Sequence, residues 1–429
     1  MTTTKTLQFA CICLSFFFFF SCKENNTVVD PNPNKDPDVE EEFDPSTVMS
    51  LREILEEYYA DDYFFIGAAA NMGFFNEENM VNSINRRYVS EFSYNTPAND
   101  FKQEQTNPKP ESTWKSSGYM AQIEAARKYG MVIRAHGPIS PQCSPWARDD
   151  SRTAEELENM LRVFMTNLSK DLEKNKDIVH WMDVVNETFT QSQQGNGIGY
   201  DGKQTGITYQ PDDWFGPRKG NNTWENPWPL IGFETLTCNG ESFQVPKYIR
   251  MAFEIANEHA PSIKKIYNEH GGAINVSAWE KIKKTILALR ESGTRVDGVG
   301  WQAHVSVGWE NVPGNVENLQ EIITWCYEND LEFHITELDV AITNYGQDQS
   351  INYALLEATR NEQAATVSSI LNLMLKNMGK GACGINFWRL TDSFGDGRTI
   401  AALFNQDAEP NEIFYRIKNT LVDFKTDKK

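Results

Sequence analysis

Two glutamates lie at or near the ends of strongly apolar segments. The first segment reads WMDVVNE and ends at Glu187, and the second reads HITELDV and contains Glu337. Burying a carboxylate without a partner is costly, so two buried carboxylates indicate a chemical use. A pair facing one another suits glycoside hydrolysis. One group protonates the leaving oxygen, while the other, ionised, attacks the anomeric carbon or activates a water.

Strand-like and helix-like segments alternate along the chain. Eight apolar or β-branched segments predict strands at residues 63–70, 87–96, 131–137, 178–187, 263–270, 296–305, 331–340 and 383–390. Apolar residues at helical spacing predict helices at residues 118–130, 154–175, 277–293 and 318–330. Strands that alternate with helices are parallel, and eight such units predict an α/β fold, a single (β/α)8 TIM barrel.

Polar and aromatic side chains gather where the predicted strands end. Active sites of such barrels lie at the C-terminal ends of the strands. Besides the two glutamates, the residues expected at that rim are His136, Asn268, Gln302, His304 and Trp388. Their concentration at one rim predicts a single site.

The chain resembles the family 10 glycoside hydrolases, mainly endo-β-1,4-xylanases, over about residues 51–424. The resemblance is carried by WMDVVNE, VDGVGWQAHV and HITELDV, with support from RAH, TPANDFK and INFWRLTD. It implies that Glu187 is the acid/base and Glu337 the nucleophile of a retaining mechanism, with a covalent glycosyl-enzyme on Glu337. It also implies that His304 contacts Glu337 and that Asp339 orients the imidazole.

Other residues of the predicted site would contact the sugar. Asn186 carries both a donor and an acceptor and suits the 2-hydroxyl of the sugar under attack. The remaining residues expected to bind substrate are Asn99, Lys102, His136, Asn268, Gln302, Trp388 and Arg389.

The sugar-binding positions depart from the family pattern. Ala98 replaces a glutamate, Ser140 and Pro141 replace a tryptophan and a histidine, Arg389 replaces a glycine, and Asp396 replaces a second tryptophan. Arg389 either reaches a decorated or acidic sugar or forms a surface ion pair. The departures leave the exact polysaccharide open, so the same mechanism on another or heavily decorated β-linked polysaccharide is the alternative.

A long connection, about residues 188–245, is predicted as an insertion between the fourth strand and its helix, which we expect near Pro246. Long connections without elements of their own are often functional. The aromatic residues of the insertion either form a wall of the site or pack into a small core of their own. They are Tyr200, Tyr209, Trp214, Phe215, Trp224, Trp228 and Phe233.

The N-terminus has the pattern of a lipoprotein signal peptide. The apolar stretch Leu7–Phe20 is too short to span a bilayer and leads to a cysteine, Cys22, after a small residue. We expect residues 1–22 to be the signal, 23–47 a disordered tether rich in acidic residues, Pro and Asn, and 48–429 the catalytic domain. This predicts a lipid anchor on Cys22 in the cell envelope, at the outer-membrane surface or in the periplasm. Simple secretion and an uncleaved anchor are the alternatives.

Composition excludes some classes of function. The formal net charge of −20 disfavours binding to nucleic acid or to an anionic membrane surface. No H-x-H or H-E-x-x-H spacing occurs, so we expect no metal and no cofactor. We also expect the protein to be a monomer. A glycan-binding lipoprotein without activity is a further alternative, although such a protein commonly loses one of the two glutamates. Four cysteines without a disulfide framework remain after signal removal: Cys143, Cys238, Cys326 and Cys383.

Overall fold

A computed structural model describes most of the chain after residue 44. The described residues are 45–189, except 72–73, 76–77, 79, 81, 107–113 and 150; Trp214; and 226–426, except 271–275, 343–349 and 396–397. They belong to one compact unit, Asp44–Lys429. The predicted signal peptide lies outside them, as does the tether up to residue 44. The first described helix, α1 (Pro45–Val48), begins three residues before the boundary expected at residue 48 and packs against the C-terminal helix.

Eight parallel strands close into a barrel, which confirms the predicted fold. They follow one another around the barrel in chain order, and the last strand pairs with both its predecessor and the first strand, which closes the ring. The strands are β1 (Phe65–Ala70), β2 (Tyr94–Pro97), β3 (Val132–Ala135), β4 (Val179–Asn186), β7 (Lys264–Glu269), β8 (Gly298–Trp301), β10 (Glu332–Ile342) and β11 (Ala382–Phe387).

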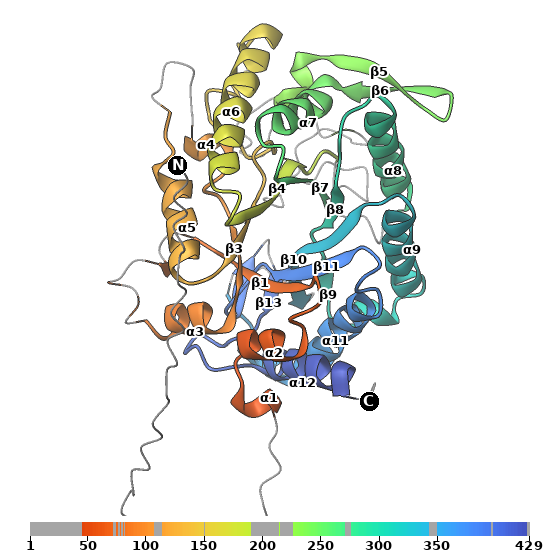
Figure 1. The fold of residues 1–429 in the computed structure, drawn as a ribbon. Coiled ribbons are helices and arrows are strands. Elements are labelled where there is room, and N and C mark those ends of the chain that lie inside the picture. Colours follow the sequence, from red (N-terminus) through yellow and green to blue (C-terminus); the bar gives the residue numbers. More distant parts are fainter. Residues whose placement is uncertain are drawn as a thin grey trace, which may run out of the picture. The chain divides into compact units, whose positions relative to one another are not determined.

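Helices surround the strands (Figure 1). They include α2 (Leu51–Tyr58), α3 (Ser83–Glu91), α5 (Ser117–Lys128), α6 (Ala154–Lys174), α7 (Lys247–His259), α8 (Val276–Glu291), α9 (Asn315–Glu328), α11 (Arg360–Lys376) and α12 (Glu412–Thr426), with the short α4 (Gln103–Thr106) and α10 (Tyr353–Ala358). No helix among the described residues is both long enough and apolar enough to cross a bilayer.

Helix α6 shows how the local sequence specifies these elements. Thr153 caps its first turn, because the Thr153 hydroxyl accepts from the Glu156 amide at 3.2 Å and the Glu156 carboxylate accepts from the Thr153 amide at 2.8 Å. Buried residues recur every three or four positions, from Leu157 through Phe164 to Leu172. The helix therefore presents one apolar stripe to the rest of the domain.

The strand predicted at residues 87–96 is wrong in its first half. Residues up to Glu91 belong to helix α3, and strand β2 begins only at Tyr94. Asn82 caps the helix by accepting from the Ile84 amide, and Tyr88 meets Phe92, four residues later, with ring centroids 5.4 Å apart. Spacing of four residues is helical, and the Tyr88 hydroxyl also donates to the Ala68 carbonyl of β1 at 2.8 Å, so tertiary packing overrides the strand preference of the local sequence.

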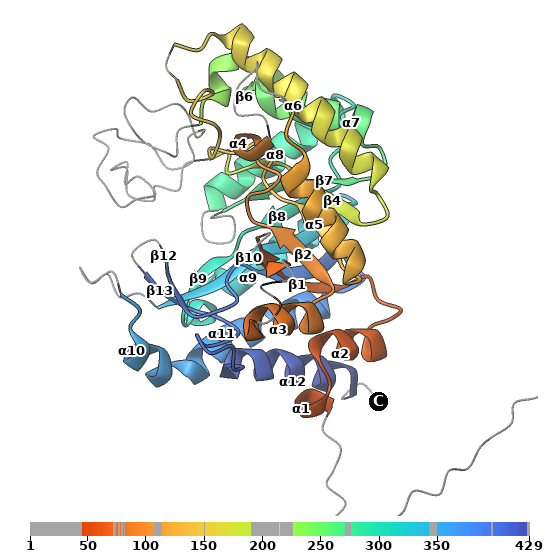
Figure 2. The same cartoon turned by 90° about the vertical axis from the view of Figure 1, so that its left-hand side faces the viewer.

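The strand predicted at residues 296–305 is interrupted. It forms β8 and a separate short strand, β9 (His304–Ser306), and Ala303 between them has φ of 58°. Strand β9 pairs with the second half of β10, which also pairs with the antiparallel strand β13 (Arg398–Ala401) and through it with β12 (Ser393–Gly395). Figure 2 shows this extension beside the barrel.

The described parts of the insertion pack against the barrel. Strands β5 (Phe233–Cys238) and β6 (Glu241–Pro246) form a hairpin next to α8, and α7 then starts at Lys247, as expected. The hairpin follows a 3-10 turn whose Trp228 is fully buried and donates from its indole N–H to the Ser140 carbonyl at 3.2 Å.

A second aromatic residue of the insertion also packs. Trp214 stacks on Phe189 with centroids 4.3 Å apart, and the Lys281 ammonium lies over both rings. These contacts favour packing over a substrate-binding role for Trp214 and Trp228. By contrast, the Phe233 side chain is exposed. The other predicted aromatic residues (Tyr200, Tyr209, Phe215 and Trp224) lie outside the described residues.

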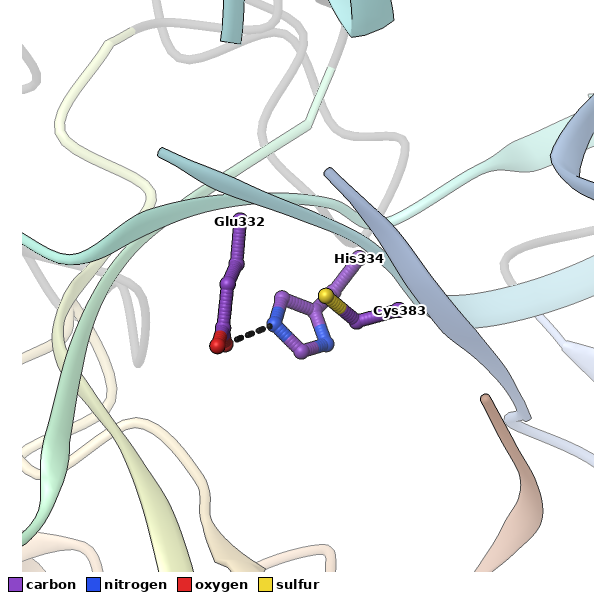
Figure 3. Close-up of side chains that lie close together, drawn as sticks. All are labelled: Glu332, His334 and Cys383. Carbon is purple, nitrogen blue, oxygen red and sulfur yellow. Dashed lines mark hydrogen bonds and ion pairs between the residues drawn. The ribbon is translucent and has the colours of Figure 1, made fainter. Parts of the chain in front are cut away.

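The N-terminal end of the barrel holds a cluster of polar side chains (Figure 3). Glu332, His334 and Cys383 offer an oxygen, a nitrogen and a sulfur within 4.8 Å of one another. Glu332 accepts from the Trp181 indole at 3.0 Å, pairs with Lys264 at 2.8 Å, and lies 3.1 Å from His334 Nε2. A metal ion would have to displace these partners. We therefore interpret the cluster as a structural hydrogen-bond network and not as a metal site. The four cysteines among the described residues are buried, and Cys238, Cys326 and Cys383 are free thiols.

Candidate active site

A cleft of about 440 Å³ opens at the C-terminal ends of the barrel strands. Polar side chains make up much of its lining. The predicted site residues that line it are Asn99, Lys102, His136, Asn186, Glu187, His304, Glu337, Asp339, Trp388 and Arg389, together with the altered positions Ala98 and Ser140. Residues from five of the predicted strands, and residues just after a sixth, thus meet in one place.

Glu337, on β10, lies buried among cationic and hydrogen-bonding groups. Asn268 donates to its Oε1 at 3.0 Å, His136 Nδ1 lies 3.7 Å from the same oxygen, and His304 Nε2 lies 3.5 Å from Oε2. Burial alone would raise the pKa of this carboxyl. The effect of His136, His304 and Arg134 is larger and lowers the pKa of Glu337 to about 2. Glu337 is therefore a carboxylate at any pH near neutrality.

His304 is held between two carboxylates. Its Nδ1 lies 3.1 Å from Asp339 and its Nε2 faces Glu337, as the sequence predicted. Burial would lower the pKa of the imidazole, but Asp339 and Glu337 outweigh it and raise the pKa of His304 to about 10. The imidazolium form therefore persists beside Glu337 around neutral pH.

Arg134 and Asp183 complete this environment, and the sequence analysis did not assign them to the site. Arg134 is fully buried, pairs with Asp183 and donates to the Thr336 carbonyl at 2.7 Å. Asp183 also lies 2.9 Å from His136 Nδ1. The sequence could have indicated Arg134, because it lies two residues before His136. Side chains of a strand alternate between its faces, so these two point to the same side.

Glu187 stands in the opposite electrostatic situation. It follows β4 directly, is 9% exposed, and accepts from Gln302 Nε2 at 2.9 Å. Burial and the negative charge of Glu337 raise the pKa of Glu187, and the Gln302 bond and Lys102 only partly offset them. One buried carboxyl is thus kept ionised and the other is made easier to protonate.

Two residues predicted to bind substrate lie behind the cleft instead. Asn268 and Gln302 are fully buried and are not part of its lining. Asn268 Nδ2 donates to Asn186 Oδ1 at 2.7 Å, and Gln302 Nε2 donates to the same oxygen at 3.1 Å. We therefore correct their assignment: their amides hold Asn186, Glu187 and Glu337 in place.

Asn99, Lys102 and Trp388, which were predicted to bind sugar, line the cleft. Lys102 is 6% exposed, donates to Asn99 Oδ1 at 3.0 Å, and also contacts Gln142. Burial lowers the pKa of Lys102, although Glu187 and Glu337 act in the opposite direction. Trp388 meets the His136 ring edge to face with centroids 5.1 Å apart.

The position next to Trp388 carries a partly buried cation. The Arg389 side chain lines the cleft, and its Nε atom is buried without a hydrogen-bond partner among the described residues. The side chain thus lies within the cleft wall.

Comparison with known proteins agrees with this arrangement. The family model for glycosyl hydrolase family 10 matches residues 54–208 and 240–420. The chain belongs to glycosyl hydrolase family 10. The break between the matched segments falls within the insertion after β4, so the family pattern covers the barrel on both sides of it.

The relatives in family 10 have low sequence identity to this chain, but the matches cover most of it. Endo-1,4-beta-xylanase A of Caldicellulosiruptor saccharolyticus is 27% identical over 83% of this chain and 93% of its own length. Endo-1,4-beta-xylanase A of Caldicellulosiruptor sp. (strain Rt8B.4) is 26% identical over 87% of this chain, which spans 48% of that longer relative. Native xylanase 10B from Thermotoga maritima superposes with a TM-score of 0.65 at 23% identity, over 88% of this chain and 100% of that one.

The ion pairs of His304 generate a prediction about titration. In the wild-type protein the imidazole of His304 should titrate with a pKa of about 10, and Asp339→Asn should lower that pKa by removing a negative charge. Because the folded pKa lies above the ordinary value of 6.5, the stability contributed by His304 is fully present below that value. It is lost as pH rises toward 10, and Asp339→Asn should diminish it.

Nitrogen-15 NMR of the imidazoles, with thermal unfolding at several pH values, measures both effects. His180, whose pKa is lowered by burial, serves as an internal control and should not respond to the substitution. A wild-type His304 that titrates at 6.5 would contradict the assignment of an imidazolium.

Proposed function

We propose that this protein is a retaining endo-β-1,4-xylanase that hydrolyses xylan by double displacement. The observation that carries the proposal is the electrostatic contrast between two buried carboxyls in one cleft: Glu337 has a pKa of about 2, whereas the pKa of Glu187 is raised. Family membership supports the reaction class. The relatives described as endo-1,4-beta-xylanases, and a xylanase 10B structure in complex with xylobiose, support xylan as the substrate.

In the first step, a Glu337 oxygen attacks the anomeric carbon while Glu187 gives its proton to the departing glycosidic oxygen. The C–O bond to the leaving sugar breaks, and an ester bond to Glu337 forms. His304 and Asn268 hold the attacking carboxylate in place. The free enzyme thus requires Glu337 ionised and Glu187 protonated, so kcat/KM falls as pH rises through the raised pKa of Glu187.

In the second step, Glu187 acts as a base. Ester formation removes the negative charge of Glu337, which was one cause of the raised pKa of Glu187, so Glu187 now remains ionised. It takes a proton from a water molecule whose oxygen attacks the anomeric carbon. The ester bond breaks, Glu337 is released as a carboxylate, and Glu187 is again protonated.

Asn186 suits a contact with the 2-hydroxyl of the sugar. Its Oδ1 already accepts from Asn268 and Gln302, so its Nδ2 hydrogens remain to donate into the cleft. A donor at this hydroxyl strengthens its bond as charge develops at the anomeric centre. Asn99, Lys102, His136 and Trp388 are proposed to bind the sugars before the scissile bond.

The division of roles predicts different behaviour for two alanine variants. Glu337→Ala should lack measurable turnover on every substrate. Glu187→Ala should lose about 10²–10⁴-fold on xylan, yet still form the glycosyl-enzyme from an aryl glycoside with a good leaving group, which needs no proton. Added azide should restore turnover of Glu187→Ala by replacing the water that needs a base.

Steady-state kinetics, together with mass spectrometry of the trapped ester, provides the measurement. Identical behaviour of the two variants on the activated substrate would reject the assignment of roles. Wild-type protein that binds xylan without cleaving it would favour the reading as an inactive glycan-binding protein.

A decorated xylan is the second candidate substrate, and the cleft wall favours it. Ala98 and Ser140 line the cleft where the family has larger side chains, and Arg389 places a guanidinium there. A guanidinium pairs well with a carboxylate, such as that of a uronic acid branch.

Arg389→Gly should therefore lower kcat/KM on a glucuronoxylan about tenfold or more, since a hydrogen bond to a charged group contributes roughly 1.5–3 kcal/mol. Hydrolysis of linear xylo-oligosaccharides should stay within about twofold, and Arg389→Lys should keep part of the preference. Equal losses on the acidic and the neutral substrate would show that Arg389 does not read the substituent.

We also propose that a lipid on Cys22 anchors the mature enzyme in the cell envelope. The support is the short apolar stretch that ends at this cysteine. In cells fed radiolabelled palmitate, the wild-type protein should carry the label and sediment with membranes, whereas Cys22→Ser should do neither. An unlabelled wild-type protein in the medium would indicate simple secretion.

A further inference from the structure

A third buried carboxyl group lies close to the candidate site. Glu269 is the last residue of β7 and is 2% exposed. Its Oε2 accepts from the Thr188 amide at 2.7 Å and from the Thr188 hydroxyl at 2.8 Å, and its Oε1 accepts from the His270 amide at 3.1 Å. The Thr188 hydroxyl also lies 2.8 Å from the Tyr267 hydroxyl. Three of these hydrogen bonds converge on Thr188, the residue that follows Glu187.

The backbone needs support at this point. Glu187 has φ of 56°, in the left-handed region that residues other than glycine rarely adopt. Such a conformation is costly and persists where the surroundings determine it strongly. The Glu187 amide donates to the Asn268 carbonyl at 3.3 Å, and the next amide, of Thr188, donates to Glu269. The turn that presents Glu187 is therefore attached to β7 at two successive residues.

We propose that Glu269 is a positioning residue: by holding Thr188, it maintains the turn at Glu187 and aims the Glu187 carboxyl at the leaving-group oxygen. Glu269 is not part of the cleft lining, so it acts through Glu187 and not through the sugar. This inference rests on the proposed role of Glu187 as acid/base.

The charge of Glu269 fits the same role. Burial raises its pKa to about 8, although the bonds from Thr188 and His270 act in the opposite direction and Glu187 adds to the increase. The neighbouring His270 is neutral, because burial lowers its pKa to about 3. Near neutral pH, Glu269 therefore adds little negative charge beside Glu187, and a glutamine at this position can supply the oxygen that accepts from Thr188.

The dependence of rate on the leaving group distinguishes positioning from general stability. A misplaced acid matters when the leaving group needs a proton and matters little when it does not. In Glu269→Ala, kcat/KM should fall at least tenfold more for phenyl β-xylobioside than for 2,4-dinitrophenyl β-xylobioside. Glu269→Gln should recover most of the loss.

Glu332→Ala is the matched control, because it removes a partly buried, hydrogen-bonded carboxylate at the opposite end of the barrel. It should lower Tm and leave the ratio between the two substrates unchanged. The proposal is overturned if Glu269→Ala lowers both substrates by one factor, or if Glu332→Ala changes the ratio as much.

Thr188→Val provides a second route if Glu269→Ala does not fold. It removes the hydroxyl bonds to Glu269 and Tyr267 and keeps the backbone amide, so the same change of ratio is expected at smaller size, and an unchanged ratio contradicts the proposal. Failure of the proposed function is a separate result: the wild-type enzyme would then hydrolyse neither aryl xylobioside nor xylan.

Discussion

The negative charge of Glu337 is the constraint on which the site depends. A carboxylate in this buried position is stable only when cations and donors surround it. Those groups come from different strands: Arg134 and His136 from the region of β3, Asn268 from β7 and His304 from β9. Closure of the barrel brings these groups to one point. The stabilisation of the Glu337 charge therefore depends on the topology of the sheet.

The same charge sets the state of its partner. At Glu187, burial and the negative charge of Glu337 outweigh the opposing effect of Lys102 and His136, which explains why two identical side chains differ in protonation. The hydrogen-bonded amides of Asn186, Asn268 and Gln302 fix the positions of the two carboxyls without neutralising either. Neutral amides suit this place, because a cation between the glutamates would lower both pKa values.

Much of the fold and of the cleft could be predicted from the sequence. The alternation of segments predicted the barrel, and Glu187, Glu337, His304 and Asp339 meet as expected, because strand ends of a barrel converge. Other features depend on contacts that a single segment does not encode. Helix α3 was mistaken for a strand because its Tyr88 is held by a bond to the Ala68 carbonyl, which is 20 residues away in the chain. Asn268 and Gln302 were assigned to the substrate because residue type does not reveal whether an amide faces the cleft or lies behind it. Glu269 escaped notice since its partner, Thr188, is 81 residues away in the chain.

The attachments of the insertion have a consequence for the exchange of parts between enzymes. Lys281 of α8 lies over the stacked rings of Phe189 and Trp214, and Trp228 donates to the Ser140 carbonyl, so the insertion contacts the rest of the domain at a residue on each side of positions 215–225. A foreign segment can be grafted in place of residues 215–225 while these anchors stay untouched. The entropic cost of closing a longer graft rises slowly, by about 0.6 kcal/mol for each doubling of its length. Exchange between these two anchors is thus a route to chimaeric family 10 enzymes that keep the catalytic residues of this chain unchanged.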